Sequence, residues 1–273
     1  MQMRICAYEP LSTEWQIWIP TQGSGSEDIK IASVITAFCA GLAAATNVQP
    51  QPGPKPQNIG IALFKGWQPL DVFGPIEAFW GLGTSQPINI YLLSEDGVSS
   101  EIKPYTPFAT NSNTSATVLT GYSYANPPPL DVLLVPGGVG TRNDAGVAPV
   151  ITFVKEVYPS LQYIISVCTG ASILARAGLL DGKRATTNKR AWAFVTQFGQ
   201  RVRWNPKARY IRDRNVWTTS GVSAGVDGVL GWIEYVWGSA VATGVENGME
   251  WNRVGANDDK FDSSRAFELA SRR

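Results

Sequence analysis

The chain has 273 residues, and 23 Lys plus Arg against 22 Asp plus Glu give a formal net charge of +1. This length suits one large α/β domain or two small ones, and the balanced charge argues against nucleic acid or an anionic membrane as a partner. The absence of His excludes Ser–His–Asp and Cys–His catalysis, His-ligated zinc and an imidazole proton shuttle. Any chemistry must therefore use Cys, carboxylates, Lys, Tyr, hydroxyl groups and the backbone.

Residues 1–57 differ in composition from the rest and are expected to form an N-terminal extension. Residues 31–45 are an uncharged apolar run, too short for a stable membrane span. The run resembles the apolar part of a secretion signal, but about thirty residues precede it and the segment before it carries little positive charge. A helix packed on the domain is an alternative, so secretion and a cytoplasmic location stay open. The Pro-rich residues 49–57 predict an extended linker.

From residue 58 onward, short apolar strands alternate with amphipathic helices, which predicts an α/β fold with a mostly parallel sheet covered on both faces. In such folds the active site lies at the carboxyl ends of the strands. Polar residues 249–273 are interpreted as a surface tail. The expected strands are 58–64, 88–93, 130–135 and 161–167, with short antiparallel strands in 100–125 and a hairpin or edge strands in 209–219. The expected helices are 70–82, 147–158, 169–178, 190–199 and 223–238, the last with Ser223 as its N-cap.

The three cysteines, Cys6, Cys39 and Cys168, are too few and too scattered for a disulfide framework or a Cys-rich metal site. One pair can form, but the sequence does not choose it. No GxGxxG follows a strand and no Walker A sequence is present, so we expect neither a nucleotide cofactor nor a metal.

Cys168 directly follows an apolar strand and precedes a helix that begins with small residues, the pattern of a nucleophile elbow. The amino end of that helix is expected to lower the thiol pKa, and the Thr169 amide is placed to donate to developing negative charge. The alternative is a buried structural cysteine, because free Cys is among the most buried residue types.

Two further segments are expected near the same edge of the sheet. Gly137 and Gly138 end another strand, and such a loop lets backbone amides approach a ligand closely. Asp71 follows the first strand and a short loop, so its carboxyl group is a candidate partner for the thiol. A helix N-cap is the alternative role for Asp71.

Five segments together resemble the ThiJ/PfpI family of the class I glutamine amidotransferase-like superfamily, over residues 58–248. The resemblance is closest to its isonitrile hydratase-like branch of fungal type. It implies a flavodoxin-like three-layer α/β sandwich, a homodimer, Cys168 as nucleophile and Asp71 as the acid facing it. The segments are IGIALFKGWQPLDVFGPIEAFW (59–80), DVLLVPGGVGTR (131–142), IISVCTG (164–170), LARAGLLDGKRATTN (174–188) and WTTSGVSAGVDGVLGWIE (217–234).

Asn188 departs from many of these relatives, which carry His at that position. The peptidase-like and glyoxalase-like branches, with their Cys–His pair, are therefore excluded. A hydratase-type site needs only a cysteine and a carboxylic acid, so the resemblance implies a lyase that adds water to a small isonitrile through a cysteine thioimidate.

Several residues around this site carry open interpretations. Asn188 and Trp67 are candidates for substrate binding, and Trp80 for lining the same apolar pocket. The basic residues of 183–190 are interpreted as a solvated face or a dimer rim. The alternative function is a non-catalytic redox-sensing or ligand-binding protein of the same fold. A transcription regulator has weak support, because neither terminus is notably basic.

Overall fold

The computed structural model describes residues 53–103 and 110–261, and the described residues from Pro54 onward belong to one compact unit. The expected strands and helices of the body of the chain are present. The strands are β1 (Asn58–Ala62), β2 (Asn89–Ser94), β3 (Ser99–Glu101), β4 (Thr117–Leu119), β5 (Gly121–Ser123), β6 (Val132–Val135), β7 (Tyr163–Ser166), β8 (Arg184–Ala185), β9 (Arg203–Trp204), β10 (Tyr210–Asp213) and β11 (Val216–Thr219). The α-helices are α2 (Pro69–Gly83), α3 (Asp144–Val157), α4 (Ala171–Arg176), α5 (Trp192–Thr196), α6 (Val222–Trp237) and α7 (Ser239–Gly248), and the 3-10 turns are η1 (Val139–Arg142), η2 (Tyr158–Ser160) and η3 (Cys168–Gly170).

A seven-stranded sheet in the order β10-β11-β7-β6-β1-β2-β5 forms the centre of the domain. All its neighbouring strands run parallel except the β10–β11 hairpin. The chain moves from β1 to β2 in one direction along the sheet and from β6 to β7 in the other. The direction therefore reverses between the neighbouring strands β1 and β6, which is where α/β folds open a crevice at the carboxyl ends of their strands.

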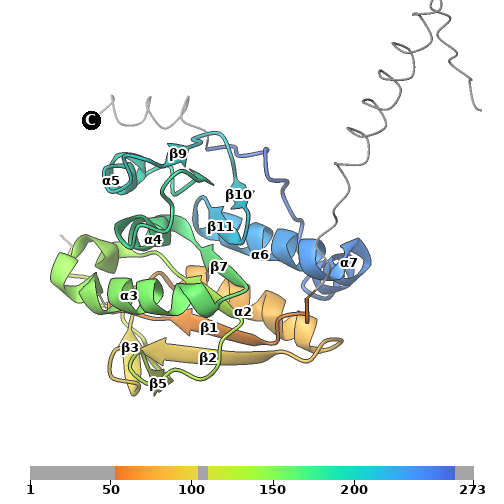
Figure 1. Cartoon of the computed structure of the whole chain (residues 1–273), viewed down its shortest axis with the longest axis horizontal. Coiled ribbons are helices and arrows are strands. Elements are labelled where there is room, and N and C mark those ends of the chain that lie inside the picture. Colours follow the sequence, from red (N-terminus) through yellow and green to blue (C-terminus); the bar gives the residue numbers. More distant parts are fainter. Residues whose placement is uncertain (1–52, 104–109, 262–273) are drawn as a thin grey trace, which may run out of the picture. The chain divides into compact units, whose positions relative to one another are not determined.

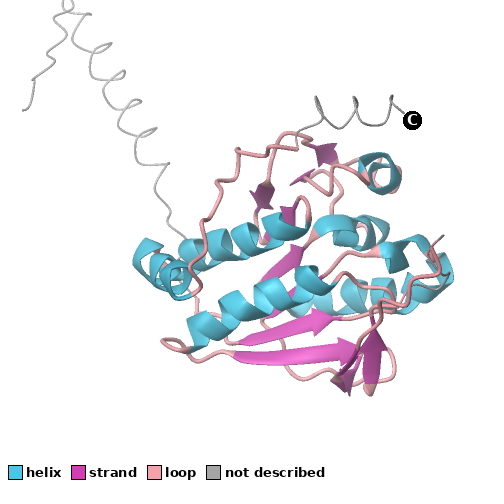
Figure 2. Ribbon diagram, turned by 180° about the vertical axis from the view of Figure 1, so that it is seen from behind, coloured by secondary structure: helices cyan, strands magenta, loops and turns pink. Residues whose placement is uncertain are grey.

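Helices cover both faces of this sheet, as Figures 1 and 2 show. Helices α2 and α6 pack together on one face, and α3 and α4 pack together on the other. This three-layer arrangement confirms the flavodoxin-like α/β fold. It explains why β6, with all four of its residues buried, reads as a continuous apolar run rather than an alternating one.

The core lies between the sheet and these helices. The central strands contribute apolar side chains that are completely buried: Ile59, Ile61, Leu133 and Ile165. Burying each such side chain contributes about 2 kcal/mol to the free energy of unfolding. This packing keeps the carboxyl ends of the strands rigid, and the polar residues described below lie at these ends.

The structure corrects two expectations for the C-terminal part of the chain and adds one helix. The N-cap of α6 is Gly221, and Ser223 lies inside the first turn, where its hydroxyl accepts a hydrogen bond from Arg209. Helix α7 was not predicted. Residues 249–261, expected to be part of a surface tail, lie against the domain: the Trp251 indole donates to Asp227, and the Arg209 amide donates to the Ala256 carbonyl.

Within residues 53–103 and 110–261, no helix has the length and apolar character needed to cross a bilayer. The apolar run 31–45, Cys6 and Cys39 lie outside the described residues. Cys168 is a free thiol. The domain boundaries proposed at residues 57 and 248 stay predictions.

Candidate functional site

Three loops meet at the carboxyl ends of β1, β6 and β7, where the direction of the sheet connections reverses. The loop after β1 leads into α2 and Asp71, the loop after β6 contains Gly137 and Gly138, and the loop after β7 carries Cys168. The backbone joins the last two loops, because the Val167 amide donates to the Val135 carbonyl at 3.0 Å. The structure therefore brings together Cys168, Asp71 and the glycine loop, the three features that the sequence indicated.

Cys168 sits at the sharp bend between β7 and the following helix. Its φ is +56°, a left-handed conformation that side-chain-bearing residues rarely adopt. The chain then makes one 3-10 turn before α4 begins at Ala171, so the expected helix 169–178 starts later as an α-helix. The Cys168 side chain is only 6% exposed, and the Thr187 hydroxyl donates to its carbonyl at 2.8 Å. The bend thus presents the sulfur in a fixed and nearly closed position.

The pKa of the Cys168 thiol is raised, which corrects the expectation of a lowered one. Burial is the largest cause, and the neighbouring Asp71 charge acts in the same direction. Hydrogen bonds from the Thr169 amide, the Asn188 side chain and the Thr169 hydroxyl act against these effects but do not outweigh them. The thiol is therefore protonated at neutral pH.

Asp71 is completely buried in the first turn of α2. Its Oδ2 accepts a hydrogen bond from the Gly137 amide at 2.9 Å, whereas its Oδ1 meets no donor at ordinary hydrogen-bond distance among the described residues. Burial raises the pKa of Asp71 to about 7, against the lowering effects of the Gly137 amide and the Cys168 thiol. The N-cap of α2 is Gln68, so Asp71 is not a helix cap. The carboxyl group can hold a proton near neutral pH.

The glycine loop holds the acid and Thr169 rather than offering free amides. The Gly137 amide donates to Asp71, and the Gly138 amide donates to the Thr169 hydroxyl at 2.9 Å. A Cβ added to Gly137 would lie 2.5 Å from the Thr169 nitrogen and 3.0 Å from Asp71 Oδ2, so only glycine fits there. Both amides therefore already have acceptors in this structure, and a role of Gly137 and Gly138 in stabilising an anionic substrate stays a prediction.

Asn188 lies beside Cys168, on the turn that follows β8. Its Oδ1 accepts a hydrogen bond from the Ala191 amide at 3.0 Å, which fixes the side chain. The same side chain hydrogen-bonds the Cys168 thiol and thereby opposes the rise of its pKa. Asn188, proposed from the sequence to bind substrate, is thus also a direct partner of the sulfur.

The two tryptophans near Asp71 have different environments. Trp67 is 1% exposed and packs edge to face against Phe73, with ring centroids 5.7 Å apart. Trp80 is 67% exposed on α2, nine residues and thus roughly 13 Å along the helix from Asp71. The structure does not bring Trp80 to the buried acid, and a role for Trp67 in substrate binding stays a prediction.

The basic segment 183–190 does not behave as one solvated face. Arg184 and Arg190 are exposed, whereas the Lys189 side chain is only 4% exposed and forms an ion pair with Asp259 at 3.3 Å. Sequence reasoning missed this pair and also missed Thr187, whose hydroxyl holds the Cys168 carbonyl. The polar run TTNK directly after a strand was the signal available for both.

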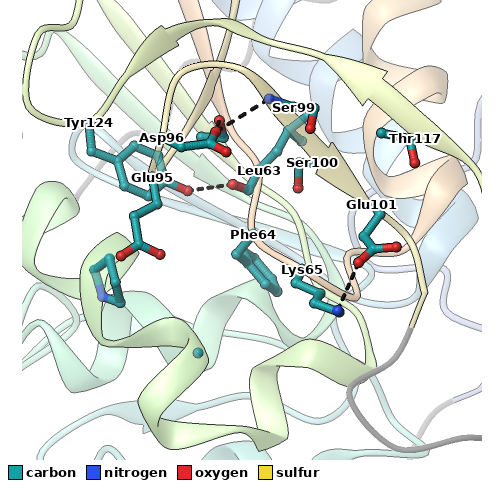
Figure 3. Close-up of a pocket in the computed structure, with 13 residues that line it drawn as sticks. Leu63, Phe64, Lys65, Glu95, Asp96, Ser99, Ser100, Glu101, Thr117 and Tyr124 are labelled. Carbon is teal, nitrogen blue, oxygen red and sulfur yellow. Dashed lines mark hydrogen bonds and ion pairs between the residues drawn. The ribbon is translucent and has the colours of Figure 1, made fainter.

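A cavity of about 480 Å³ lies at the carboxyl ends of β1 and β2, beside β3 and the start of α3 (Figure 3). Its lining does not include Cys168 or Asp71. Among the described residues that line it, three carry carboxylates, Glu95, Asp96 and Glu101, and one carries an ammonium group, Lys65, which pairs with Glu101 at 2.8 Å. The cavity is therefore separate from the thiol and negatively charged. In the part of the chain that the structure describes, no cluster of acidic, Cys or His residues can hold a metal ion.

Comparison with known proteins finds related sequences and the same fold. A family described as the DJ-1/PfpI family matches residues 57–234. The isonitrile hydratase of Pseudomonas putida is 33% identical over 173 residues, which cover 63% of this chain and 69% of that protein. The HTH-type transcriptional regulator GbdR of Pseudomonas aeruginosa is 30% identical over 134 residues, but these cover only 36% of the regulator.

Solved structures show the same fold. A THiJ/PfpI family protein from Pseudomonas syringae superposes with a TM-score of 0.61 and 25% identity, covering 84% of this chain and 95% of that one. Drosophila melanogaster DJ-1beta superposes with a TM-score of 0.57 and 16% identity, covering 72% of this chain and 98% of that one.

Proposed function

Because this chain belongs to the DJ-1/PfpI family, we propose that it acts as an isonitrile hydratase, adding water to a small isonitrile to give an N-substituted formamide. The observation that carries the proposal is the buried pair of Cys168 and Asp71 in a chain without His. The isonitrile hydratase relative supports the same reaction class. An isonitrile presents its reactive carbon at the narrow end of a linear group, which suits a cysteine that is only 6% exposed.

In the first step the Cys168 sulfur bonds to the terminal isonitrile carbon. The thiol proton passes to the Asp71 carboxylate, and Asp71 then donates it to the same carbon. The product is a thioimidate, R–N=CH–S–Cys168, formed by addition without a leaving group. The Thr169 amide and the Asn188 side chain hydrogen-bond the sulfur and stabilise the negative charge that develops on it.

In the second step water adds to the thioimidate carbon, and one of its protons moves to the nitrogen. The resulting R–NH–CH(OH)–S intermediate loses the sulfur, so the formamide R–NH–CHO leaves. The hydroxyl proton returns to the pair of Cys168 and Asp71, which restores the thiol. No cofactor takes part in this sequence.

The proposal is tested by incubating the purified chain with cyclohexyl isonitrile and following N-cyclohexylformamide by chromatography. We expect formamide with the native protein and none above the uncatalysed background with Cys168→Ala. Formamide production by the Cys168→Ala variant at the native rate would remove the proposed mechanism.

The pH dependence follows from the raised pKa of Asp71. The reactive form of the pair holds one proton, on the sulfur or on the carboxyl group, and the doubly protonated form that prevails below the Asp71 pKa of about 7 is inactive. We therefore expect kcat/KM to rise with pH through about 7 and then to level off. A kcat/KM that falls as pH rises from 6 to 8 would show that the doubly protonated pair is the active form.

The homodimer that the family resemblance implies stays a prediction, and the exposed face of α2 is the surface we expect it to bury. Leu70, Phe73 and Trp80 are exposed there at helical spacing. We expect the native protein to sediment as a dimer and Trp80→Glu to shift it toward monomer. Glu77→Gln on the same helix, which leaves the apolar side chains in place, is the control, and an unchanged dimer with Trp80→Glu would exclude this face.

The negatively charged cavity favours a second candidate function, the binding of a small organic cation. Its carboxylates outnumber its ammonium group, and the buried Ser100 hydroxyl in its lining has no hydrogen-bond partner among the described residues. We expect millimolar alkylamines to raise the thermal midpoint of the native protein but not of Glu95→Gln. No shift with any amine would contradict this function. Redox sensing at Cys168 stays the alternative function, and it too needs the thiolate of a thiol whose pKa is raised by burial.

A further inference from the structure

The turn that carries Thr187 and Asn188 touches the nucleophile at two points. The Thr187 hydroxyl donates to the Cys168 carbonyl at 2.8 Å, and the Asn188 side chain hydrogen-bonds the thiol. The position of this turn therefore sets both the backbone of the bend and the polarity around the sulfur.

Lys189 holds this turn in place through the contacts of its ammonium group. Its ammonium group donates to the Thr186 hydroxyl and to the Ala208 carbonyl, each at 2.8 Å, and pairs with Asp259 at 3.3 Å. The side chains of Lys189 and Asp259 are only 4% and 1% exposed. A buried ammonium group needs such a counter-charge, because removing one member of a buried ion pair leaves the other uncompensated.

Asp259 reaches this position because the chain beyond α7 is held against the domain. The buried Asp227 carboxylate accepts hydrogen bonds from the Trp251 indole at 2.8 Å and from the Val254 amide at 3.1 Å. The Arg209 amide in turn donates to the Ala256 carbonyl at 2.7 Å. Asp259 lies outside residues 57–234, which match the family, so this contact is an addition to the matched domain.

We infer that Asp259 is a positioning residue for the thiol: through Lys189 it holds the Thr187–Asn188 turn against Cys168. The inference rests on the proposed function, which gives Cys168 its role as nucleophile. Asp71, on α2, is the charged group whose effect on the pKa of this thiol is direct, so we assign Asp259 an effect on the sulfur only through the turn.

Alkylation of Cys168 by iodoacetamide tests this without any isonitrile, with the modified peptide followed by mass spectrometry because Cys6 and Cys39 are also present. Asp259→Asn removes the counter-charge, so the turn loosens and the thiolate loses the Asn188 hydrogen bond. We expect alkylation at pH 8 to slow by about tenfold, the effect of one pKa unit on the thiolate fraction. Asp258→Asn, next in the chain and exposed, is the matched control and is expected to alkylate at the native rate.

The double variant Asn188→Ala/Asp259→Asn separates positioning from a general structural role. If Asp259 acts through Asn188, the double variant alkylates no more slowly than Asn188→Ala alone. Two results would overturn the inference. One is that Asp259→Asn slows alkylation by the same factor in the Asn188→Ala background as in the native protein. The other is that folded Asp259→Asn alkylates at the native rate.

Unfolding cannot imitate the expected result, because an unfolded chain exposes the thiol and alkylates faster. If circular dichroism shows that Asp259→Asn is unfolded, Lys189→Met/Asp259→Asn, which buries no charge, takes its place with the same expected slowing. A failure of isonitrile turnover in the native protein leaves these alkylation rates interpretable, so the two proposals fail separately.

Discussion

Asp71→Asn is expected to stabilise the protein at pH 8 by up to about 4 kcal/mol while abolishing isonitrile hydration. The folded-state pKa of Asp71 is about 7, against 3.8 for an exposed Asp, and each unit of difference corresponds to about 1.4 kcal/mol. The carboxyl group therefore favours the folded state below pH 3.8, and that contribution is lost as pH rises through 7. An Asn side chain never ionises, so it avoids this cost and keeps an oxygen for the Gly137 amide.

The measurement is urea unfolding of both proteins at pH 4 and at pH 8. The gain from Asp71→Asn should be large at pH 8 and close to zero at pH 4. Glu77→Gln, an exposed change on the same helix, should alter stability at neither pH. A loss of stability with Asp71→Asn at pH 8, or a gain independent of pH, would contradict a buried acid with a raised pKa.

Asp227→Ala is expected to destabilise the protein by about 3–5 kcal/mol, the usual cost of leaving a buried charge without its partner. Asp227 is completely buried on α6, and its carboxylate accepts a hydrogen bond from Arg209 Nε at 2.6 Å. The same carboxylate holds Trp251 and Val254, so its removal also frees residues 249–261 from the domain.

Thermal unfolding checks this prediction, and the midpoint should fall by roughly 10 °C. Glu234→Gln is the matched control, because Glu234 also lies on α6 and pairs with Arg253 at 2.7 Å but is partly exposed. Such a surface pair contributes about 0–1 kcal/mol. Equal losses for the two variants would mean that Asp227 is not an anchor of the C-terminal segment.

The parts of the fold that the sequence predicted correctly carry short-range signals. Strand β7 is a mostly buried segment that ends at Ser166, two residues before Cys168, and small residues follow the cysteine. Asp71 comes one loop after the apolar strand β1. In a parallel sheet these positions share one edge, so local pattern and topology together were sufficient to bring the two residues together.

The features that the sequence did not predict depend on distant contacts. Lys189 and Asp259 lie 70 residues apart, so the polar run around Lys189 does not show which residue pairs with it. The polar composition of residues 249–261 indicates a surface tail. The hydrogen bonds of this segment to Asp227 and Arg209 join residues that are distant in the sequence, so the segment alone does not reveal them. The raised pKa of Cys168 arises from burial, a tertiary property, which outweighs the local effect expected from the helix that follows.

The central claim is that Cys168 adds to an isonitrile carbon without a leaving group, and the mass of the trapped protein tests it most directly. The native protein is mixed with excess cyclohexyl isonitrile and quenched in acid within milliseconds. After digestion, the mass of the peptide that contains Cys168 is measured by mass spectrometry. The account predicts an added mass equal to that of the whole isonitrile on Cys168, absent from Cys168→Ala. Formamide production with no adduct on Cys168 at any time before turnover is complete would contradict it.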